Sequence, residues 1–362
     1  MKKLILLVLV IFVVSLQAQS QTLFRSGRFF HHSTGENIWG PNGSSTSVPQ
    51  QMTIYNTNHS YTGQYAVTMS EMWFPVSYDN EWYTWHTIFE TNSPENISSY
   101  FSGNKIIMVK SCFPSSELEG VGAPGDTLYP DYKTIYNYKW HWRHILTIMK
   151  NHPQNFFVIW TNAPLTPSQT TSSAAMWSKQ FCKWAKDTLA NGLDPVFGAF
   201  PNNVYVFDFF SKLTDSNGYM LLMYAMAPDD PHPNATATAL VAPQLVNEVF
   251  DHSIAYELIY SIKKLNEIVP EDYHLYQNYP NPFNPLTNIK FDLPKNGNVK
   301  LSIFDILGKK VVTLVNEKLN AGTYEVDWEA GLGSSLTLSS GIYLYTLETD
   351  GYVNVKKMVL MK

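Results

Sequence analysis

The sequence predicts a two-domain protein, with an α/β domain built on a parallel sheet followed by a smaller all-β sandwich. Between residues 22 and 266, short runs rich in β-branched and aromatic residues alternate with helical patterns. That alternation is typical of a parallel sheet whose two faces are covered by helices. After residue 285 only strand patterns remain, with apolar and polar residues alternating between turns of Asn, Gly and Ser. The length of 362 residues also exceeds what a single core usually spans.

The first domain contains several strand candidates. The run "RFFHH" at residues 28–32 ends in a tight turn and a helix start, "STGENIW". The further candidates lie at residues 51–56, 104–110, 155–161 and 203–210. Helical patterns occupy residues 136–152, 174–191 and 239–266.

The composition indicates a folded protein without a nucleic-acid partner. Hydrophobic residues make up 44% of the chain and charged residues 15%. A net charge of −5, with no basic cluster, does not provide the positive surface that nucleic acid requires.

The N-terminus is typical of a secretory signal peptide. Lys2 and Lys3 precede an apolar core at residues 4–16, and "AQS" at residues 18–20 offers a cleavage site of small residues. Because the apolar core is only thirteen residues long, it is too short to span a bilayer comfortably. No later segment is long and apolar enough to do so. We therefore expect an exported protein with a signal peptide at residues 1–20 and no transmembrane segment.

A proline-rich linker separates the two predicted domains. Pro280, Pro282 and Pro285 prevent regular structure there. We assign residues 21–268 to the α/β domain and residues 269–362 to the β-sandwich.

The second domain resembles a known sorting domain over its whole length. The residues that match are "YQNYPNPFNPLTNIKFDLP", "VKLSIFDILGKKVVTLV", "AGTYEVDWEA", "SSGIYLYTLET" and the closing "KKMVLMK". In order and spacing they are similar to the type A C-terminal sorting domain of the type IX secretion system of Bacteroidetes-type bacteria. The resemblance implies an immunoglobulin-like sandwich and a cargo that the type IX machinery carries from the periplasm to the cell surface or the medium. A generic carbohydrate-binding or adhesion sandwich is the alternative.

Two short motifs in the first domain are candidates for catalysis. Ser33 follows the first predicted strand, at the edge of the sheet where open α/β folds bind ligands. Asp229 and His232 lie in "DDPHPN", between the last strand and the last helix of this domain. A carboxylate on one imidazole nitrogen would orient the other nitrogen toward a nucleophile.

A serine near the N-terminus and an Asp-x-x-His turn near the C-terminus resemble the SGNH (GDSL-type) hydrolases, over residues 24–260. The resemblance implies a flavodoxin-like three-layer sandwich and an esterase without metal or organic cofactor. Ser33 would be the nucleophile, His232 the general base and Asp229 the residue that orients His232. His31-His32 stands where the family has Gly-Asp.

The resemblance also suggests the donors of an oxyanion hole. Gly63 in "NHSYTG" matches the second family block. The third block usually supplies an Asn side chain, but Ser111 or Cys112 occupies that place here. Asn162 in "VIWTNAPLTP" is another candidate for the missing amide.

Simpler interpretations exist for several of these residues. Ser33 followed by Glu36 also matches a helix N-cap with a capping box. A metal site at His31 and His32 is disfavoured, because adjacent strand residues point to opposite faces. Cys112 and Cys182 are either a disulfide or two separate buried thiols.

Residues 71–89, "EMWFPVSYDNEWYTWHTIF", are unusually aromatic. Trp73, Trp82 and Trp85 would form a platform for sugar rings beside the cleft, or would pack an insertion against the core. We therefore expect an exported esterase that removes acyl groups, acetyl foremost, from a polysaccharide. The alternative is a non-catalytic carbohydrate-binding protein of the cell surface that keeps the fold.

Overall fold

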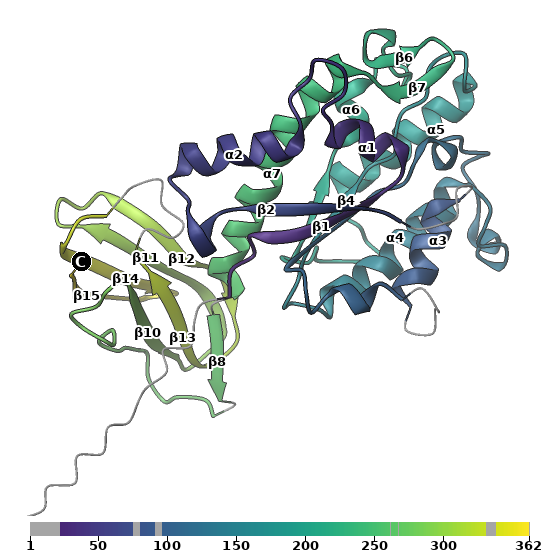
Figure 1. Cartoon of the computed structure of the whole chain (residues 1–362). Helices are drawn as coiled ribbons and strands as arrows, with labels where there is room; N and C mark the ends of the chain where they lie inside the picture. The colour runs from purple at the N-terminus through teal and green to yellow at the C-terminus, as the bar shows by residue number, and fades with distance from the viewer. Residues whose placement is uncertain are drawn as a thin grey trace, which may run out of the picture.

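The computed structural model describes residues 22–74, 80–90, 96–260, 262–266, 268–330 and 338–361. The described chain forms an α/β body and a β-sandwich, joined where the last helix of the first leads into the second (Figure 1). The predicted signal peptide lies outside the described residues. Among the helices that the structure describes, none is both long and apolar enough to cross a membrane.

The α/β body is built on a five-stranded sheet in which every pair of neighbours is parallel, as predicted. The strand order β2-β1-β3-β4-β5 is that of flavodoxin-like folds. The strands are β1 (Ser26–His31), β2 (Thr68–Trp73), β3 (Ile106–Val109), β4 (Phe156–Trp160) and β5 (Val204–Phe207).

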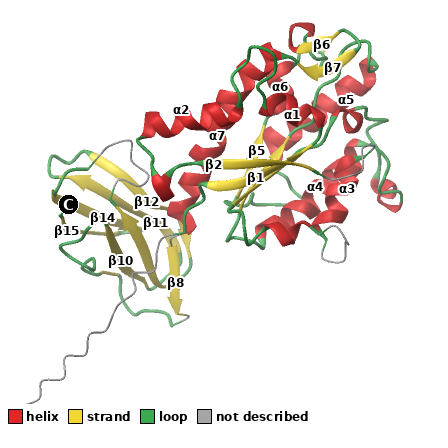
Figure 2. Cartoon of the chain, viewed as in Figure 1, coloured by secondary structure: helices red, strands yellow, loops and turns green. Residues whose placement is uncertain are grey.

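Helices cover both faces of this sheet (Figure 2). One hydrophobic core joins the sheet to α1 (Ser33–Trp39), α2 (Val48–His59) and α7 (Ala235–Tyr260). A second core joins it to α3 (Glu81–Phe89), α4 (Ile135–Lys150) and α5 (Ser172–Lys183), which continues as a π-helical turn over Trp184–Leu189. Successive strand residues alternate between these cores, so that Phe29 faces the first and Phe30 the second. The short helix α6 (Phe209–Leu213) follows β5.

Short elements complete the body. The 3-10 turns are Gly63–Tyr65, Ile97–Tyr100, Phe113–Ser116, Pro124–Leu128 and Leu222–Tyr224. The antiparallel hairpin of β6 (Ala225–Ala227) and β7 (Asp230–Pro233) precedes α7.

Three sequence-based assignments were wrong. Residues 51–56 belong to α2, because a Ser47 capping box starts a helix there and the apolar side chains of Met52 and Tyr55 share its buried face. The second strand is instead Thr68–Trp73. The aromatic segment, interpreted as an insertion, contributes the end of β2 and, over its described residues from 80 on, α3. Residues 262–266, taken for the end of a helix, form strand β8.

The C-terminal part consists of two four-stranded antiparallel sheets, as predicted. One has the order β8-β13-β10-β9 and the other β12-β11-β14-β15. Their strands are β8 (Ile262–Asn266), β9 (His274–Leu275), β10 (Leu286–Leu293), β11 (Gly297–Asp305), β12 (Lys310–Leu319), β13 (Gly322–Glu329), β14 (Gly341–Thr349) and β15 (Tyr352–Leu360). Because β8 pairs with β13, the proposed boundary after residue 268 lies beyond the first strand of this sandwich.

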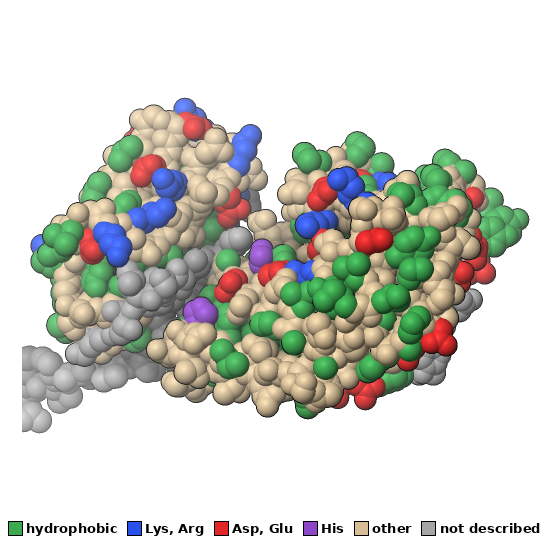
Figure 3. All heavy atoms as spheres, turned by 90° about the horizontal axis from the view of Figure 1, so that it is seen from above, with side chains coloured by type: hydrophobic (Ala, Val, Ile, Leu, Met, Phe, Trp, Pro, Cys, Tyr) green, Lys and Arg blue, Asp and Glu red, His purple; other side chains and the backbone are tan. Residues whose placement is uncertain are grey.

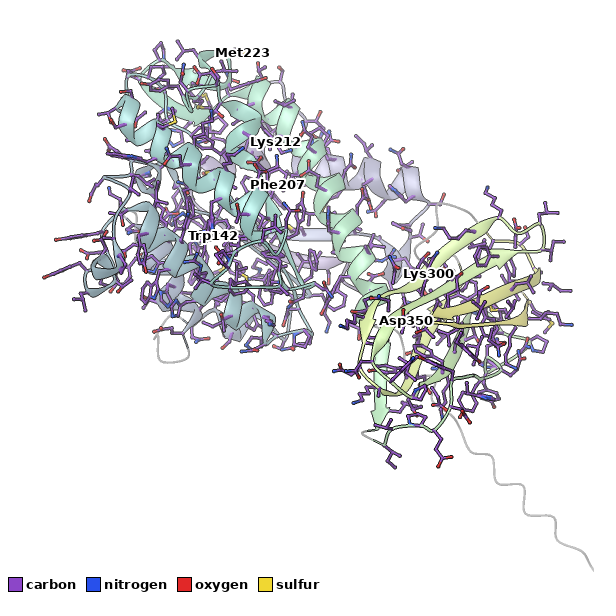
Figure 4. All side chains as sticks on the ribbon, turned by 180° about the vertical axis from the view of Figure 1, so that it is seen from behind. Trp142, Phe207, Lys212, Met223, Lys300 and Asp350 are labelled. Carbon is purple, nitrogen blue, oxygen red and sulfur yellow. The ribbon has the colours of Figure 1, made fainter. Side chains whose placement is uncertain are left out.

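The β6–β7 hairpin lies at the end of the α/β body far from the sandwich (Figure 1). Figure 4 shows the same from behind: Met223, next to β6, lies at the far end, and Lys300 and Asp350 mark the sandwich. Apolar side chains gather on the face of the α/β body seen from above (Figure 3). The exposed apolar side chains in β6 and directly before it include Leu221, Leu222, Met223 and Met226.

Candidate active site

Ser33, His232 and Asp230 form a hydrogen-bonded chain at the carboxyl edge of the parallel sheet. Ser33 is the first residue of α1, directly after β1 and His32. Its Oγ lies 2.9 Å from Nε2 of His232, and Nδ1 of His232 lies 2.6 Å from Oδ1 of Asp230. With the proton on Nδ1, His232 donates to the carboxylate and accepts from the serine hydroxyl. This is the arrangement of a nucleophile, a base and an orienting acid.

The carboxylate that meets His232 is Asp230, whereas the sequence pointed to Asp229. Asp230 and His232 are two apart on strand β7, so their side chains leave the same face of the hairpin. Asp229 precedes the strand and is exposed to solvent. The expected Asp-x-x-His turn is therefore an Asp-x-His strand pair.

The environment of the pair supports an ionised Asp230. Partial burial raises the pKa of Asp230, but the hydrogen bonds that it accepts from the ring and the backbone N–H of His232 outweigh burial and lower the pKa. The ring of Phe113 meets the His232 ring edge to face at 5.0 Å between centroids. These contacts restrict the rotation of the imidazole.

Ser33 is not the N-cap of α1. The N-cap is His32, which has an extended backbone and makes no capping bond with its side chain. The Ser33 hydroxyl lies against His232 instead. Gly35 is required in this turn, because a Cβ there would stand 2.3 Å from the Cβ of His31.

The two histidines before Ser33 point to different carboxylates. Nε2 of His31 lies 3.0 Å from Oε2 of Glu71, and Nδ1 of His32 lies 2.7 Å from Oε1 of Glu81. Burial lowers the pKa of His31 to about 4, which keeps its ring neutral. Within the described ranges, no group of three or more His, Cys, Asp or Glu side chains is placed to hold a metal ion.

Glu81 is a site residue that sequence reasoning missed. It is fully buried at the start of α3, and its second oxygen, Oε2, accepts the backbone N–H of Cys112 at 2.5 Å. Cys112 Sγ in turn lies 3.6 Å from Ser33 Oγ and 3.0 Å from Thr34 Oγ1. The sequence shows Glu81 only as one of three polar residues, with Asp79 and Asn80, that interrupt an aromatic segment.

Gly63 lies at the wrong edge of the sheet to serve an oxyanion hole. It precedes β2 by five residues, and the first residue of β2, Thr68, pairs with Ser26 at the start of β1. Ser33 follows the other end of β1, about 20 Å away along the strand. The residues after β1, and not those before β2, therefore surround the serine.

The remaining oxyanion candidates differ in what they touch. Asn162 is buried, accepts from Trp82 Nε1 and donates to Ser178 Oγ, so its amide is already engaged. Ser111 Oγ is buried without a hydrogen-bond partner among the described atoms. Only the Cys112 sulfur lies against Ser33.

The three tryptophans have different roles. Trp82 and Trp85 are fully buried in α3, and their indole N–H groups donate to Asn162 and to the Lys110 carbonyl. They pack the core and cannot stack on a sugar. Trp73, at the end of β2, is 46% exposed, and its ring lies 5.3 Å from the His32 ring.

The two cysteines are separate buried thiols. Cys112 lies at the serine, whereas Cys182 lies in α5, where burial raises its thiol pKa. The disulfide that the sequence left open is not formed.

Comparison with known proteins identifies the C-terminal part. Residues 277–361 match the family model of the secretion system C-terminal sorting domain. No curated protein matches the chain. Similar solved structures include dimeric latent PorU of Porphyromonas gingivalis, 20% identical over 26% of this chain and 10% of that chain, with a TM-score of 0.21. PorZ of the same organism is 17% identical over 25% of this chain and 12% of that one, with a TM-score of 0.19.

The chain thus spans about a tenth of the length of PorU and PorZ. A gut microbial diltiazem-metabolizing enzyme, BT4096, is similar over 81% of this chain and 70% of its own, with 8% identity and a TM-score of 0.35. The family match is specific to the sandwich. Residues 277–361 form a type IX secretion C-terminal sorting domain, which marks the chain for secretion or export to the cell surface by the type IX machinery.

Proposed function

We propose that the α/β body is a serine esterase of SGNH type that hydrolyses O-acyl esters outside the cell. The observation that carries the proposal is the continuous contact from Ser33 Oγ through the His232 ring to the Asp230 carboxylate. The predicted order of these residues along the chain, serine first and histidine last, supports the same family.

The reaction would proceed through an acyl-enzyme. Ser33 Oγ attacks the ester carbonyl while His232 Nε2 takes its proton, and Asp230 stabilises the imidazolium that results. When the tetrahedral intermediate collapses, His232 returns the proton to the leaving alcohol. Water, activated by the same histidine, then releases the acid and regenerates the serine.

The oxyanion would be stabilised by groups at the β1–α1 turn. The first N–H groups of a helix have no intrahelical acceptor, and Ser33 is the first residue of α1. The Cys112 thiol, 3.6 Å from Ser33 Oγ, would be a side-chain donor beside the serine. A single amide donor in an oxyanion hole is worth about 3 kcal/mol of transition-state stabilisation, and a thiol is a weaker donor than an amide.

An acylated carbohydrate, acetylated foremost, is the substrate class that we propose. The sorting domain supports an extracellular location, where polysaccharide is available. Trp73 offers a half-exposed ring beside His32 and the nucleophile turn, and such rings stack on sugars.

The test is hydrolysis of p-nitrophenyl acetate by the chain without residues 1–20. Ser33→Ala should reduce kcat at least a hundredfold. The exposed serine variant Ser172→Ala, in the first turn of α5, is the control and should match the unsubstituted chain. Equal rates for Ser33→Ala and the control would remove Ser33 from the mechanism.

A non-catalytic carbohydrate-binding protein is the second candidate. The engagement of Asn162 by Trp82 and Ser178 favours it, because no amide is left at that position to complete an oxyanion hole. This candidate predicts no hydrolysis of any ester, together with binding to a polysaccharide that Trp73→Ala weakens.

A further inference from the structure

We infer that Glu81 is a positioning residue. Its buried carboxylate fixes the turn that carries Ser33 relative to the loop that carries Cys112. This inference rests on the proposed esterase function. The carboxylate of Glu81 binds His32 and the backbone N–H of Cys112, so its effect on Ser33 passes through these two residues.

The two oxygens of Glu81 bind two segments that meet at Ser33. Oε1 lies 2.7 Å from Nδ1 of His32, the residue before the nucleophile and the N-cap of its helix. Oε2 accepts the backbone N–H of Cys112 at 2.5 Å, and the sulfur of that residue reaches Ser33 Oγ. The end of β1 and the loop after β3 are therefore linked to a single side chain.

Glu81 is itself held rigidly. Its backbone N–H donates to Ser115 Oγ at 2.8 Å. The preceding residue, Asn80, caps α3 by accepting the N–H of Tyr83, and its amide donates to the Asp131 carbonyl. A group that orients others must itself be fixed by its neighbours. The contacts of Glu81 and Asn80 fix the residue that carries this carboxylate.

Stability alone does not account for this pair. Glu81 and His32 are 0% and 1% exposed. Burying a carboxylate costs several kcal/mol, and a hydrophobic pair of similar volume is often equally stable. A buried, fully bonded carboxylate at this place is explained by the geometry that it imposes.

The expected consequence is a loss in kcat with little change in KM. Ser33 is held by His232 on one side and, through His32, by Glu81 on the other. A displacement of about 1 Å at a reacting group can cost a hundredfold in rate. Because Glu81 is buried below the turn, substrate binding should be unaffected.

The neighbouring histidine provides a matched control. Nε2 of His31 lies 3.0 Å from Oε2 of Glu71 but makes no hydrogen bond among the described atoms, so Glu71→Gln removes a carboxylate charge beside the neighbouring histidine without breaking a bond that holds the turn. Glu71 is 42% exposed and stands opposite Phe29, which faces the first core, whereas Glu81 belongs to α3, which packs in the second core.

The experiment compares Glu81→Gln with Glu71→Gln in the chain without residues 1–20. It measures kcat and KM on p-nitrophenyl acetate, the rate of Ser33 phosphonylation by a fluorophosphonate, and Tm. We expect Glu81→Gln to lower kcat and the phosphonylation rate tenfold or more, with KM within twofold. Glu71→Gln should leave both rates within twofold. If Glu81→Gln fails to fold, His32→Gln keeps the bond between Glu81 and Cys112 and should show the same loss in kcat alone.

The outcomes separate this inference from the function on which it rests. Equal rates for the two glutamate variants, in a chain that hydrolyses the ester, would overturn the inference and leave the esterase standing. A loss that is confined to KM would also overturn it. A chain that neither hydrolyses the ester nor reacts with the fluorophosphonate would overturn both.

Discussion

At the scale of single residues, the candidate site depends on direct contacts between three side chains. Ser33 Oγ, His232 and one aspartate oxygen are joined by distances of 2.9 and 2.6 Å. The identity of the aspartate was the point at which sequence reasoning failed. An Asp-x-x-His motif does not reveal whether the segment turns or extends, and only an extended β7 brings Asp230 to the histidine.

Replacement of Asp230 and replacement of Asp229 should therefore differ in their effect on kcat. Asp230→Asn removes the acceptor that orients His232, and kcat on p-nitrophenyl acetate should fall about 10³- to 10⁴-fold, as for the orienting acid of other triads. Asp229→Asn, next to it in an exposed position, should retain full activity. A loss of activity in Asp229→Asn but not in Asp230→Asn would show that Asp229, as predicted from the sequence, orients His232.

At the scale of elements, the strands buried on both faces were the easiest to predict. β3 and β4 are continuous apolar runs with no exposed residue. The segment at residues 51–56 was misread because "MTIY" suits a strand equally well by composition, and the Ser47 capping box decides for a helix. Of the two interpretations left open for the tryptophans of α3, packing against the core is the one that the structure bears out, and aromatic density alone could not decide between them.

The turn between β1 and α1 should not tolerate a larger residue at Gly35. Its Cβ would stand 2.3 Å from His31 Cβ and 2.6 Å from the ring carbon Cγ, so the turn that carries Ser33 would have to move. Gly35→Ala should destabilise the fold by about 1–3 kcal/mol and reduce kcat. Gly103→Ala, where a Cβ meets nothing within 4 Å, is the control for chemical denaturation. Unchanged stability in Gly35→Ala would contradict the packing described.

At the scale of the whole molecule, the α/β body carries the candidate site and the C-terminal part carries the sorting domain. The five parallel strands bring Ser33 to one edge, and the β6–β7 hairpin brings His232 to it from two hundred residues away. The sorting domain lies at the other end of the molecule (Figure 1) and leaves that edge uncovered. Its identity could be predicted from the sequence because its motifs are dense. The motifs on which the proposed esterase rests are sparse, so the partners of the serine could be identified only from the structure.

Acid should destabilise the whole α/β body in a definite pH range. Burial lowers the pKa of His31 and His141 to about 4 and that of His86 to about 3, against an ordinary value of 6.5. Between these values only the unfolded chain binds the protons, so stability is complete above pH 6.5 and is lost as the pH falls toward 4. Unfolding at pH 5 should take up about three protons through these groups.

The measurement is chemical unfolding at several pH values between 7.5 and 5. The free energy of unfolding should change little above pH 6.5 and decrease below it, and His86→Gln should reduce the slope near pH 5 by about one proton. A free energy that does not change with pH here would show that these rings are not buried as neutral groups.

The proposed esterase requires that Ser33 is a nucleophile activated by His232. Mass spectrometry of the chain after treatment with a fluorophosphonate, which phosphonylates activated serines, tests this requirement. We expect one adduct, on the peptide that contains Ser33, in the unsubstituted chain and none in His232→Ala. An adduct on another residue, or equal labelling in both proteins, would contradict it.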